Sequence, residues 1–204
     1  TAEIGTRGGL GRVGWDVAAF RAWIRDELQL FDAGNGATFA LNADRTIHQG
    51  VEIGLDASVV QGLFETGAAP DDLWLRTAYT FSDFRFDDDD AFGDNELPGA
   101  PRHYLRAELL YRHPAGFFVG PNVEWVPEAY YVDNANTLDT KPYALLGARA
   151  GYDFGFGSVY VDARNLTDEK YISNANVTPV ATANSALFNP GDGAGVFVGA
   201  EIRW

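Results

Sequence analysis

Apolar and polar residues alternate along the last nine positions of the chain. Val196, Val198, Ala200, Ile202 and Trp204 fall on one face of an extended strand, and Gly199, Glu201 and Arg203 fall on the other, with Phe197 as the exception. A period of two indicates a β-strand whose two faces meet different surroundings. The chain is therefore expected to end in a strand that closes on an aromatic residue.

The same alternation recurs along the chain and predicts about nine strands. The predicted ranges are 2–6, 14–30, 49–60, 73–86, 103–111, 117–132, 143–154, 159–165 with an extension beyond, and 196–204. The first is a stub that Gly8, Gly9 and Gly11 end. In the second, Ala18, Phe20, Ala22 and Ile24 are expected to form the apolar face, with Arg21 and Arg25 opposite. No helix is predicted.

Full charges occupy the polar face of almost every predicted strand. Arg149, Asp153, Asp162, Arg164, Glu201 and Arg203 all stand at such positions. The core of a β-sandwich could not hold so many charges, because unpaired buried charge is costly. A water-filled lumen with lipid outside removes that conflict. The fold class predicted is all-β, an antiparallel transmembrane β-barrel segment.

The connections between these strands alternate between long and short. The long ones are residues 32–46, 87–101, 133–141 and 174–195, and the short turns lie at Gly8, Pro70, Pro114 and Gly155. Transmembrane barrels combine long extracellular loops with short periplasmic turns. If the chain ends on the periplasmic side, all four long connections face the outside.

Composition narrows the function further. The chain has 204 residues, of which 46% are hydrophobic, with 23 Gly, 9 Pro, no Cys and no Met. Its net charge of −14 argues against nucleic acid as a partner, because phosphate binding needs a basic surface. The absence of Met predicts a processed product or a piece of a longer protein. Without Cys there is no disulfide framework and no thiolate metal site.

Six segments of the chain form a distinctive set of motifs. They are residues 46–52, 97–103, 122–125, 131–137, 163–171 and 190–204. The most specific is Asn165-Leu-Thr-Asp-Glu-Lys-Tyr171, followed by a Pro-Gly pair and a closing aromatic strand. Together these segments resemble the C-terminal part of the β-barrel of TonB-dependent outer-membrane receptors, and the resemblance covers nearly the whole chain in the family's order.

The resemblance implies a bacterial outer-membrane receptor that takes up a scarce nutrient, commonly a ferric siderophore, driven by TonB. Such receptors close a barrel of about 22 strands around a plug domain. Residues 1–204 would form the C-terminal portion of that barrel, with the plug domain absent and no transport by this portion alone. The implied partners are the lipid bilayer, the TonB complex and the plug of a full-length receptor, the small ligand and the barrel-assembly machinery.

Candidate site residues follow from the predicted lumen and loops. Arg106, Arg149, Arg164 and His103 are predicted to contact the ligand, from the lumen or from the extracellular side. Phe197, Ile202 and Trp204 of the closing strand are predicted to form the outer-membrane assembly signal.

The sequence gives only weak indications of metal binding or catalysis. The run Asp87 to Asp90 lacks the spacing of a calcium loop and is interpreted as a solvated loop. Asp133, Asn134 and Asn136 are interpreted as turn residues. His48, His103 and His113 are isolated, and no catalytic set can be defended, so no enzyme, metal or cofactor is predicted.

Two questions stay open at this stage. Tyr79, Phe81, Trp125, Tyr130, Tyr131 and Trp204 fit either membrane-interface girdles or ordinary strand aromatics. The alternative functions are an autonomous small outer-membrane barrel with a structural or adhesion role, and a soluble ligand-binding barrel. In the soluble barrel the apolar faces would point inward, an inversion that alternation alone does not exclude.

Overall fold

The computed structural model describes residues 1–32, 38–64, 67, 69–182 and 184–203, and their regular structure is β-strand. The strands are β1 (Ala2–Leu10), β2 (Val13–Asp32), β3 (Thr38–Gln61), β4 (Asp72–Phe86), β5 (His103–Arg112), β6 (Phe117–Val126), β7 (Tyr143–Asp153), β8 (Gly157–Arg164), β9 (Ile172–Ala175), β10 (Phe188–Pro190) and β11 (Gly195–Ile202). These residues include no helix long and apolar enough to cross a membrane.

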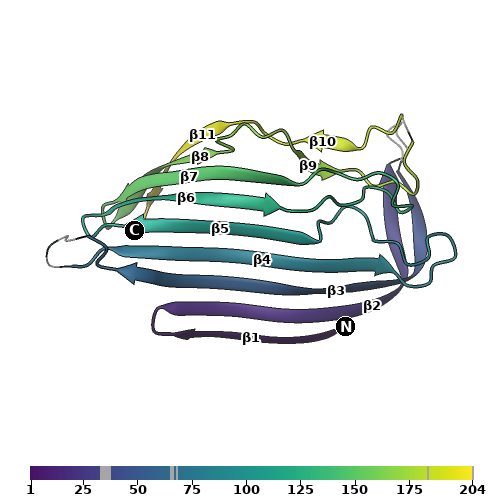
Figure 1. Ribbon diagram of the computed structural model, residues 1–204, viewed down its shortest axis with the longest axis horizontal. Coiled ribbons are helices and arrows are strands. Elements are labelled where there is room, and N and C mark those ends of the chain that lie inside the picture. Colours follow the sequence, from purple (N-terminus) through teal and green to yellow (C-terminus); the bar gives the residue numbers. More distant parts are fainter. Residues whose placement is uncertain (33–37, 65–66, 68, 183, 204) are drawn as a thin grey trace.

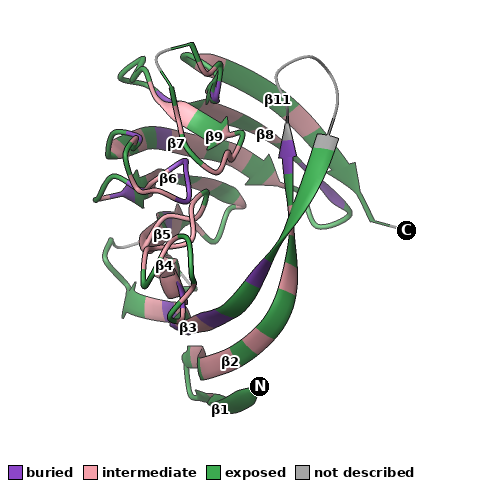
Figure 2. Ribbon diagram, turned by 90° about the vertical axis from the view of Figure 1, so that its right-hand side faces the viewer, coloured by how far each residue is buried: buried purple, intermediate pink, exposed green. Residues whose placement is uncertain are grey.

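Nine strands form a single antiparallel sheet, as predicted. Their order is β1-β2-β3-β4-β5-β6-β7-β8-β11, and β9 pairs with β10 in a separate two-stranded sheet (Figure 1). The sheet curls, with β1 and β11 at its two edges (Figure 2). Because the hydrogen-bonded order ends at these two strands, the described sheet is an open arc of a barrel wall.

The convex face of the arc is apolar and exposed. In β11, Val196, Val198 and Ala200 pair with Ala163, Val161 and Val159 of β8, so these residues share one face. Val198 is 80% exposed. The alternation predicted for the last strand is confirmed over the described residues, while Trp204 lies outside them.

The predicted orientation of β2 is wrong. Ala18, Phe20, Ala22 and Ile24 pair with Glu52, Gly50, His48 and Thr46, which lie on the concave face with Asp56. The convex face of β2 carries Trp15, Val17, Ala19, Arg21 and Trp23 instead. Both faces of this strand are therefore partly apolar. On the concave face, the Phe20 ring lies over Gly50, next to Phe84.

Several predicted boundaries are also wrong. The first strand runs on to Leu10, because Gly8 makes room for the ring of Trp15 on β2 and does not break the strand. Its turn comes at Gly11, where φ is +60°. The sixth strand ends at Val126, six residues early and just before Pro127. The third begins at Thr38, inside the stretch predicted as loop.

The rhythm of long and short connections is present in the structure. Residues 11–12, 62–71, 113–116 and 154–156 turn at one end of the sheet, which we call the short-connection end. Residues 87–102, 127–142 and 165–194 link strands at the opposite, long-connection end.

A buried carboxylate organises one turn at the short-connection end. The Asp71 side chain is 0% exposed and accepts hydrogen bonds from the amides of Leu63 (2.6 Å) and Phe64 (3.0 Å). The Tyr111 hydroxyl of β5 donates a third, at 2.8 Å. Burial opposes ionisation, but the hydrogen bonds from Tyr111, Leu63 and Phe64 outweigh it, so the pKa of Asp71 lies below its ordinary value.

The hairpin of β2 and β3 bends at the long-connection end. Asp26 has a φ of +53°, in the left-handed region that non-glycine residues seldom occupy. Beyond this residue the paired strands turn upward across the end of the sheet (Figure 1). Glu27 thereby reaches the concave face, where Thr46 Oγ1 donates to its carboxylate at 2.5 Å and His48 Nε2 lies 3.2 Å away.

Candidate functional site

The concave face holds a cavity of about 680 Å³. Strands β4 to β8, β11 and the 165–194 connection supply its walls. Its charged lining residues are Arg76, Arg106, Glu108, Glu124, Arg149, Asp162, Arg164 and Asp192. The lining therefore balances four arginines against four acids. A polar cavity of this size can hold a small ligand and fix its orientation through a few charged groups.

The antiparallel register pairs most of these charges across neighbouring strands. Arg76 Nε lies 2.8 Å from Asp56 Oδ2, and Arg76 Nη1 lies 3.9 Å from Glu108 Oε2. Arg106 Nε lies 3.6 Å from Glu124 Oε2. These positions face one another in the ladders of β3, β4, β5 and β6, so each strand supplies counter-charges to the next.

Arg149 differs from the other arginines of the cavity. Among the described residues, no carboxylate lies at ion-pair distance from it, and its Nε is buried without a hydrogen-bond partner. Its guanidinium carbon lies 4.6 Å from the ring centroid of Tyr160 and 5.7 Å from that of Phe118. Aromatic faces attract a cation but leave its N–H donors unused. Arg149 is thus the cavity cation best prepared to receive an anion.

Glycines on the concave face let these rings lie flat. A Cβ on Gly151 would overlap the Phe118 ring, and one on Gly199 would overlap the Tyr160 ring. Both glycines lie in register beside the aromatic residue they accommodate. Both rings thereby lie at cation–π distance from the Arg149 guanidinium.

Phe197, the exception to the alternation of the last strand, belongs to this cavity. It faces the concave side opposite Asp162 and lies under Arg164, whose guanidinium carbon is 4.7 Å from the ring centroid. Arg164 also pairs with Asp162 at 2.9 Å. Of the predicted assembly residues, Ile202 lies on the convex face and is exposed.

The structure brings together three of the four predicted ligand residues. Arg106, Arg149 and Arg164 line the cavity. His103 lies on the convex face opposite Phe81, and its Nδ1 lies 2.7 Å from the Tyr79 hydroxyl. It is therefore on the other side of the sheet from the three arginines.

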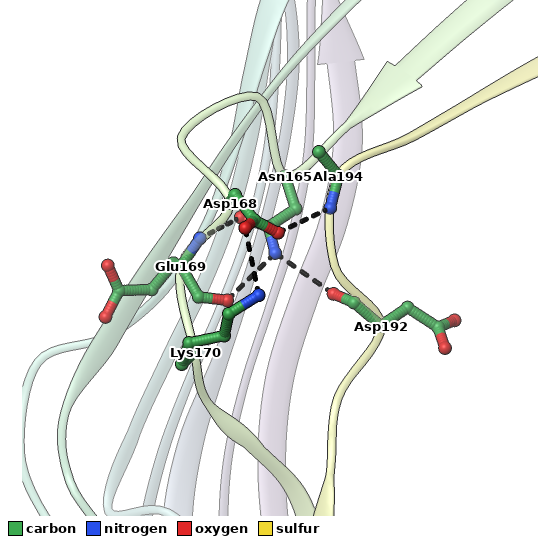
Figure 3. A network of polar contacts seen from close by, with 6 residues as sticks. All are labelled: Asn165, Asp168, Glu169, Lys170, Asp192 and Ala194. Carbon is green, nitrogen blue, oxygen red and sulfur yellow. Dashed lines mark hydrogen bonds and ion pairs between the residues drawn. The ribbon is translucent and has the colours of Figure 1, made fainter.

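One wall of the cavity is fixed by the Asn165 motif (Figure 3). The Asn165 amide Nδ2 donates to the carbonyls of Glu169 and Asp192, both at 3.0 Å, and its Oδ1 accepts from the Glu169 amide at 2.8 Å. Asp168 accepts from the Ala194 amide at 3.1 Å. Lys170 first, and then this amide, hold the pKa of Asp168 below its ordinary value. The motif thus joins the residues after β8 to those before β11.

Asp133 joins two connections at the long-connection end, in addition to the turn role that the sequence indicates. It is 0% exposed and accepts from the amides of Thr137 (2.9 Å), Leu138 (3.0 Å) and Ala181 (3.0 Å). The Thr137 hydroxyl donates a fourth bond at 2.5 Å. Burial raises its pKa, but these hydrogen bonds more than compensate, so the pKa lies below the ordinary value. The contact to Ala181 spans 48 residues of sequence.

Neighbouring amides extend this anchor to two further segments. Asn136 exchanges hydrogen bonds with the backbone of Glu96, at 2.8 and 2.9 Å. Asn134 Nδ2 donates to Gln29 Oε1 of the bent hairpin at 2.8 Å. We call Asp133, Asn134 and Asn136 the loop anchor. It joins the three long connections and the β2–β3 hairpin into one unit.

The other acidic and aromatic candidates take structural positions. In the run Asp87 to Asp90, Asp89 accepts from the amides of Ala91 and Phe92, and Asp88 pairs with Arg45 at 3.3 Å. In the described part of the chain, no group of three His, Cys, Asp or Glu could hold a metal ion. Tyr130 is buried, whereas Trp125 is exposed on the convex face.

Comparison with known proteins identifies the family to which this fold belongs. The family model described as "TonB dependent receptor-like, beta-barrel" matches residues 1–166. The siderophore receptor PiuA from Acinetobacter baumannii superposes with a TM-score of 0.70 at 18% identity, covering 98% of this chain and 28% of that one. The ferric yersiniabactin uptake receptor FyuA from Yersinia pestis gives 0.71 at 20% identity, with 98% and 29% covered.

A third similar structure is titled a copper transporter. It is OprC, with a TM-score of 0.72 at 13% identity, covering 98% of this chain and 30% of its own. At these identities the likeness of the structures concerns the fold. The chain spans less than a third of each of these proteins.

Proposed function

Because this chain belongs to the TonB dependent receptor-like β-barrel family, we propose that it forms part of an outer-membrane receptor for a scarce nutrient. The proposed ligand class is a ferric siderophore, and the proposed driving partner is the TonB complex. The observation that carries the proposal is the charged cavity on the concave face of a wall whose convex face is apolar and exposed. The receptor role involves binding and uptake, with no enzymatic step.

The two faces support a place in the bacterial outer membrane. Large apolar side chains such as Leu146 and Val161 are exposed on the convex face, where lipid would cover them. The concave charges would meet water inside a barrel. A soluble barrel with its apolar faces inward would require the opposite curvature of the sheet. The structure therefore favours the hypothesis of a membrane barrel over that of a soluble barrel.

The unpaired edges support membership of a larger barrel. Backbone groups along β1 and β11 lack a ladder partner in the described sheet. A barrel wall in lipid must satisfy such groups by closing. We propose that residues 1–204 are the C-terminal portion of a barrel of about 22 strands, which in the whole protein surrounds a plug domain. A closed small barrel of these nine strands would need β1 and β11 to pair.

Arg149 is proposed as a principal ligand contact, with Arg106 and Arg164 beside it. Pairing an anionic group with Arg149 breaks no existing ion pair, whereas Arg106 and Arg164 must share their carboxylate partners. The long connections above the cavity would face the outside and close over the ligand.

The test uses the full protein that carries this chain, in cells that lack their own iron receptors. We expect Fe³⁺-loaded catecholate or hydroxamate siderophores to enter only when TonB is present. Arg149→Gln should weaken binding by about tenfold, as expected for loss of one charge-assisted hydrogen bond. Arg7→Gln is the matched control, because Arg7 pairs with Asp16 on β1 and β2, away from the cavity.

Three outcomes would overturn parts of this proposal. Uptake of Cu²⁺ with no siderophore uptake would replace the ligand class. Equal uptake without TonB would remove the driving partner. A folded monomer that stays in solution without detergent would overturn the membrane placement itself.

A further inference from the structure

Four arginines interrupt the apolar convex face near the long-connection end of β2, β3 and β4. We call Arg21, Arg25, Arg45 and Arg85 the outer arginine cluster. Four of the 15 basic residues of a chain with net charge −14 thus gather in one place. The grouping is therefore local and does not reflect a generally basic protein.

The strand register places the cluster in three neighbouring rows. Arg21 pairs with Gln49 in the first row, Ile47 pairs with Arg85 in the second, and Arg25 pairs with Arg45 in the third. Directly paired positions lie on the same face of an antiparallel sheet, with Cβ atoms about 5 Å apart. Arg21 lies two residues after Ala19 on β2, so both side chains point to the same face. Ala19 pairs with Val51 on the convex face, and these rows therefore lie on the convex face.

The carboxylates beside the cluster are exposed or already have other partners. Glu96 stands opposite Arg85 in an isolated bridge, but its side chain pairs with Arg102 at 2.5 Å. Arg25 and Arg45 stand directly opposite each other, and like charges in this position destabilise a sheet. The ion pair of Arg45 with Asp88 is largely exposed and therefore weak. The Asp83 carboxylate of the first row accepts a hydrogen bond from Gln49 at 2.5 Å.

Two of the arginines also carry unused donors. Arg21 Nε and Arg85 Nε are buried and have no hydrogen-bond partner among the described residues. Ile47, which lies between Trp23 and Arg85 in the second row, is only 3% exposed. A buried N–H without an acceptor is costly, and an anion at this place would supply one.

The cluster lies where a membrane boundary is expected. Trp23 is 56% exposed, and the Arg21 guanidinium carbon lies 5.1 Å from its ring centroid. Toward the short-connection end, the same face continues with Ala19, Val51 and the exposed Ile53. Aromatic and basic residues at the rim of an apolar band are typical of the interface between lipid tails and headgroups.

We propose that the outer arginine cluster binds the phosphate of an anionic lipid headgroup in the surrounding leaflet. The planar guanidinium presents paired donors that match phosphate oxygens, and several guanidinium groups around one phosphate relieve their mutual repulsion. The proposal rests on the membrane placement proposed above and is independent of the transported ligand.

The test compares lipid binding by the full protein in nanodiscs of phosphatidylcholine doped with an anionic phospholipid or with lipid A. Native mass spectrometry and fluorescence of labelled lipid give the bound amount. We expect the double variant Arg25→Gln, Arg45→Gln to bind the anionic lipid about 30-fold more weakly, because each basic residue near an anionic surface contributes on the order of fivefold. The matched control is Arg7→Gln with Arg12→Gln, which removes two charges at the short-connection end.

The outcomes separate this proposal from the receptor function. Equal lipid binding by wild type, double variant and control would overturn the lipid site, even if siderophore uptake is normal. Displacement of the lipid by millimolar inorganic phosphate would also overturn it, because the site would then be one for free phosphate. Loss of lipid binding with unchanged siderophore affinity would support it. Failure of the protein to enter nanodiscs would instead overturn the membrane placement.

Discussion

Asp71 and Asp133 are both fully buried carboxylates, but they lie at opposite ends of the sheet and act over different distances along the chain. Asp71 binds two amides of its own turn and one hydroxyl of β5. Asp133 binds its own turn and also Ala181, a residue of another connection. The same chemistry therefore shapes a single turn at one end and couples separate loops at the other. In the receptor proposed above, this coupling would lie where the loops meet the ligand.

Removing the Asp133 carboxylate should have the largest effect on the coupling between the loops. In Asp133→Ala, four donors lose a charged acceptor, which we expect to cost about 3 kcal/mol of local stability. Hydrogen exchange and limited proteolysis should show opening of residues 127–142 and 176–182 together. Asp139→Ala is the control, because Asp139 is exposed in the same connection. Opening of residues 127–142 alone would contradict the coupling of the loops.

Acid should reproduce this loss without a mutation. The pKa of Asp133 is depressed in the folded protein, because hydrogen bonds to the ionised form outweigh its burial. Its stabilisation is therefore fully present above the ordinary carboxyl value of about 3.9 and is lost as pH falls through the folded-state pKa. The protection factor of the Ala181 amide, which is its intrinsic exchange rate divided by its measured rate, should stay constant from about pH 8 to about pH 5 and fall below about pH 4. A fall in this protection factor already at neutral pH would contradict this assignment.

Asp71→Asn should have a smaller and strictly local effect. The amide keeps an acceptor for the Leu63 or Phe64 amide but loses the charge that strengthens both bonds and the bond from Tyr111. We expect faster exchange in residues 62–71 and no change at the loop anchor. Asp90→Asn serves as the control, because Asp90 is exposed in the 87–102 connection. Altered exchange at Thr137 or Ala181 would show that the two ends are coupled after all.

Gln29→Ala should have the smallest effect. It removes the hydrogen bond from Asn134 to the bent hairpin, worth about 1 kcal/mol. Spin labels on the hairpin and on the 127–142 connection should report a broader distance distribution. The β2–β3 ladder itself should keep its exchange protection. An unchanged distribution would mean that the bend at Asp26 alone positions the hairpin.

The sequence predicted the strands whose two faces differ in polarity. In β5, β7, β8 and β11 the apolar residues alternate with charges, and the structure places both faces as expected. Prediction failed on β2, where consecutive residues such as Val17, Ala18, Ala19 and Phe20 are apolar on both faces. Alternation does not indicate there which face is the convex one. The packing of Phe20 over Gly50 on the concave face could not be predicted without knowing the neighbouring strand.

Local information also explains which candidate residues share the cavity, while their contact with a ligand stays a prediction. Arg106, Arg149 and Arg164 line the cavity because of the parity of their strands. His103 has the opposite parity and lies on the convex face, so its position near a strand end does not bring it to the cavity. The role of Asp133 depends on a contact 48 residues away, so its pattern looked like that of an ordinary turn.

The glycines beneath the aromatic rings of the cavity limit how this protein can evolve. A side chain at position 199 would meet the ring at position 160, whereas one at position 151 would meet both the Phe118 ring and the backbone carbonyl of Val159. Relatives should therefore change positions 160 and 199 together, and they should keep glycine at 151 whatever residue stands at 118. Sequence covariation between 160 and 199, beside an unchanging 151, would then trace the shape of the cavity across lineages whose loops have diverged beyond alignment.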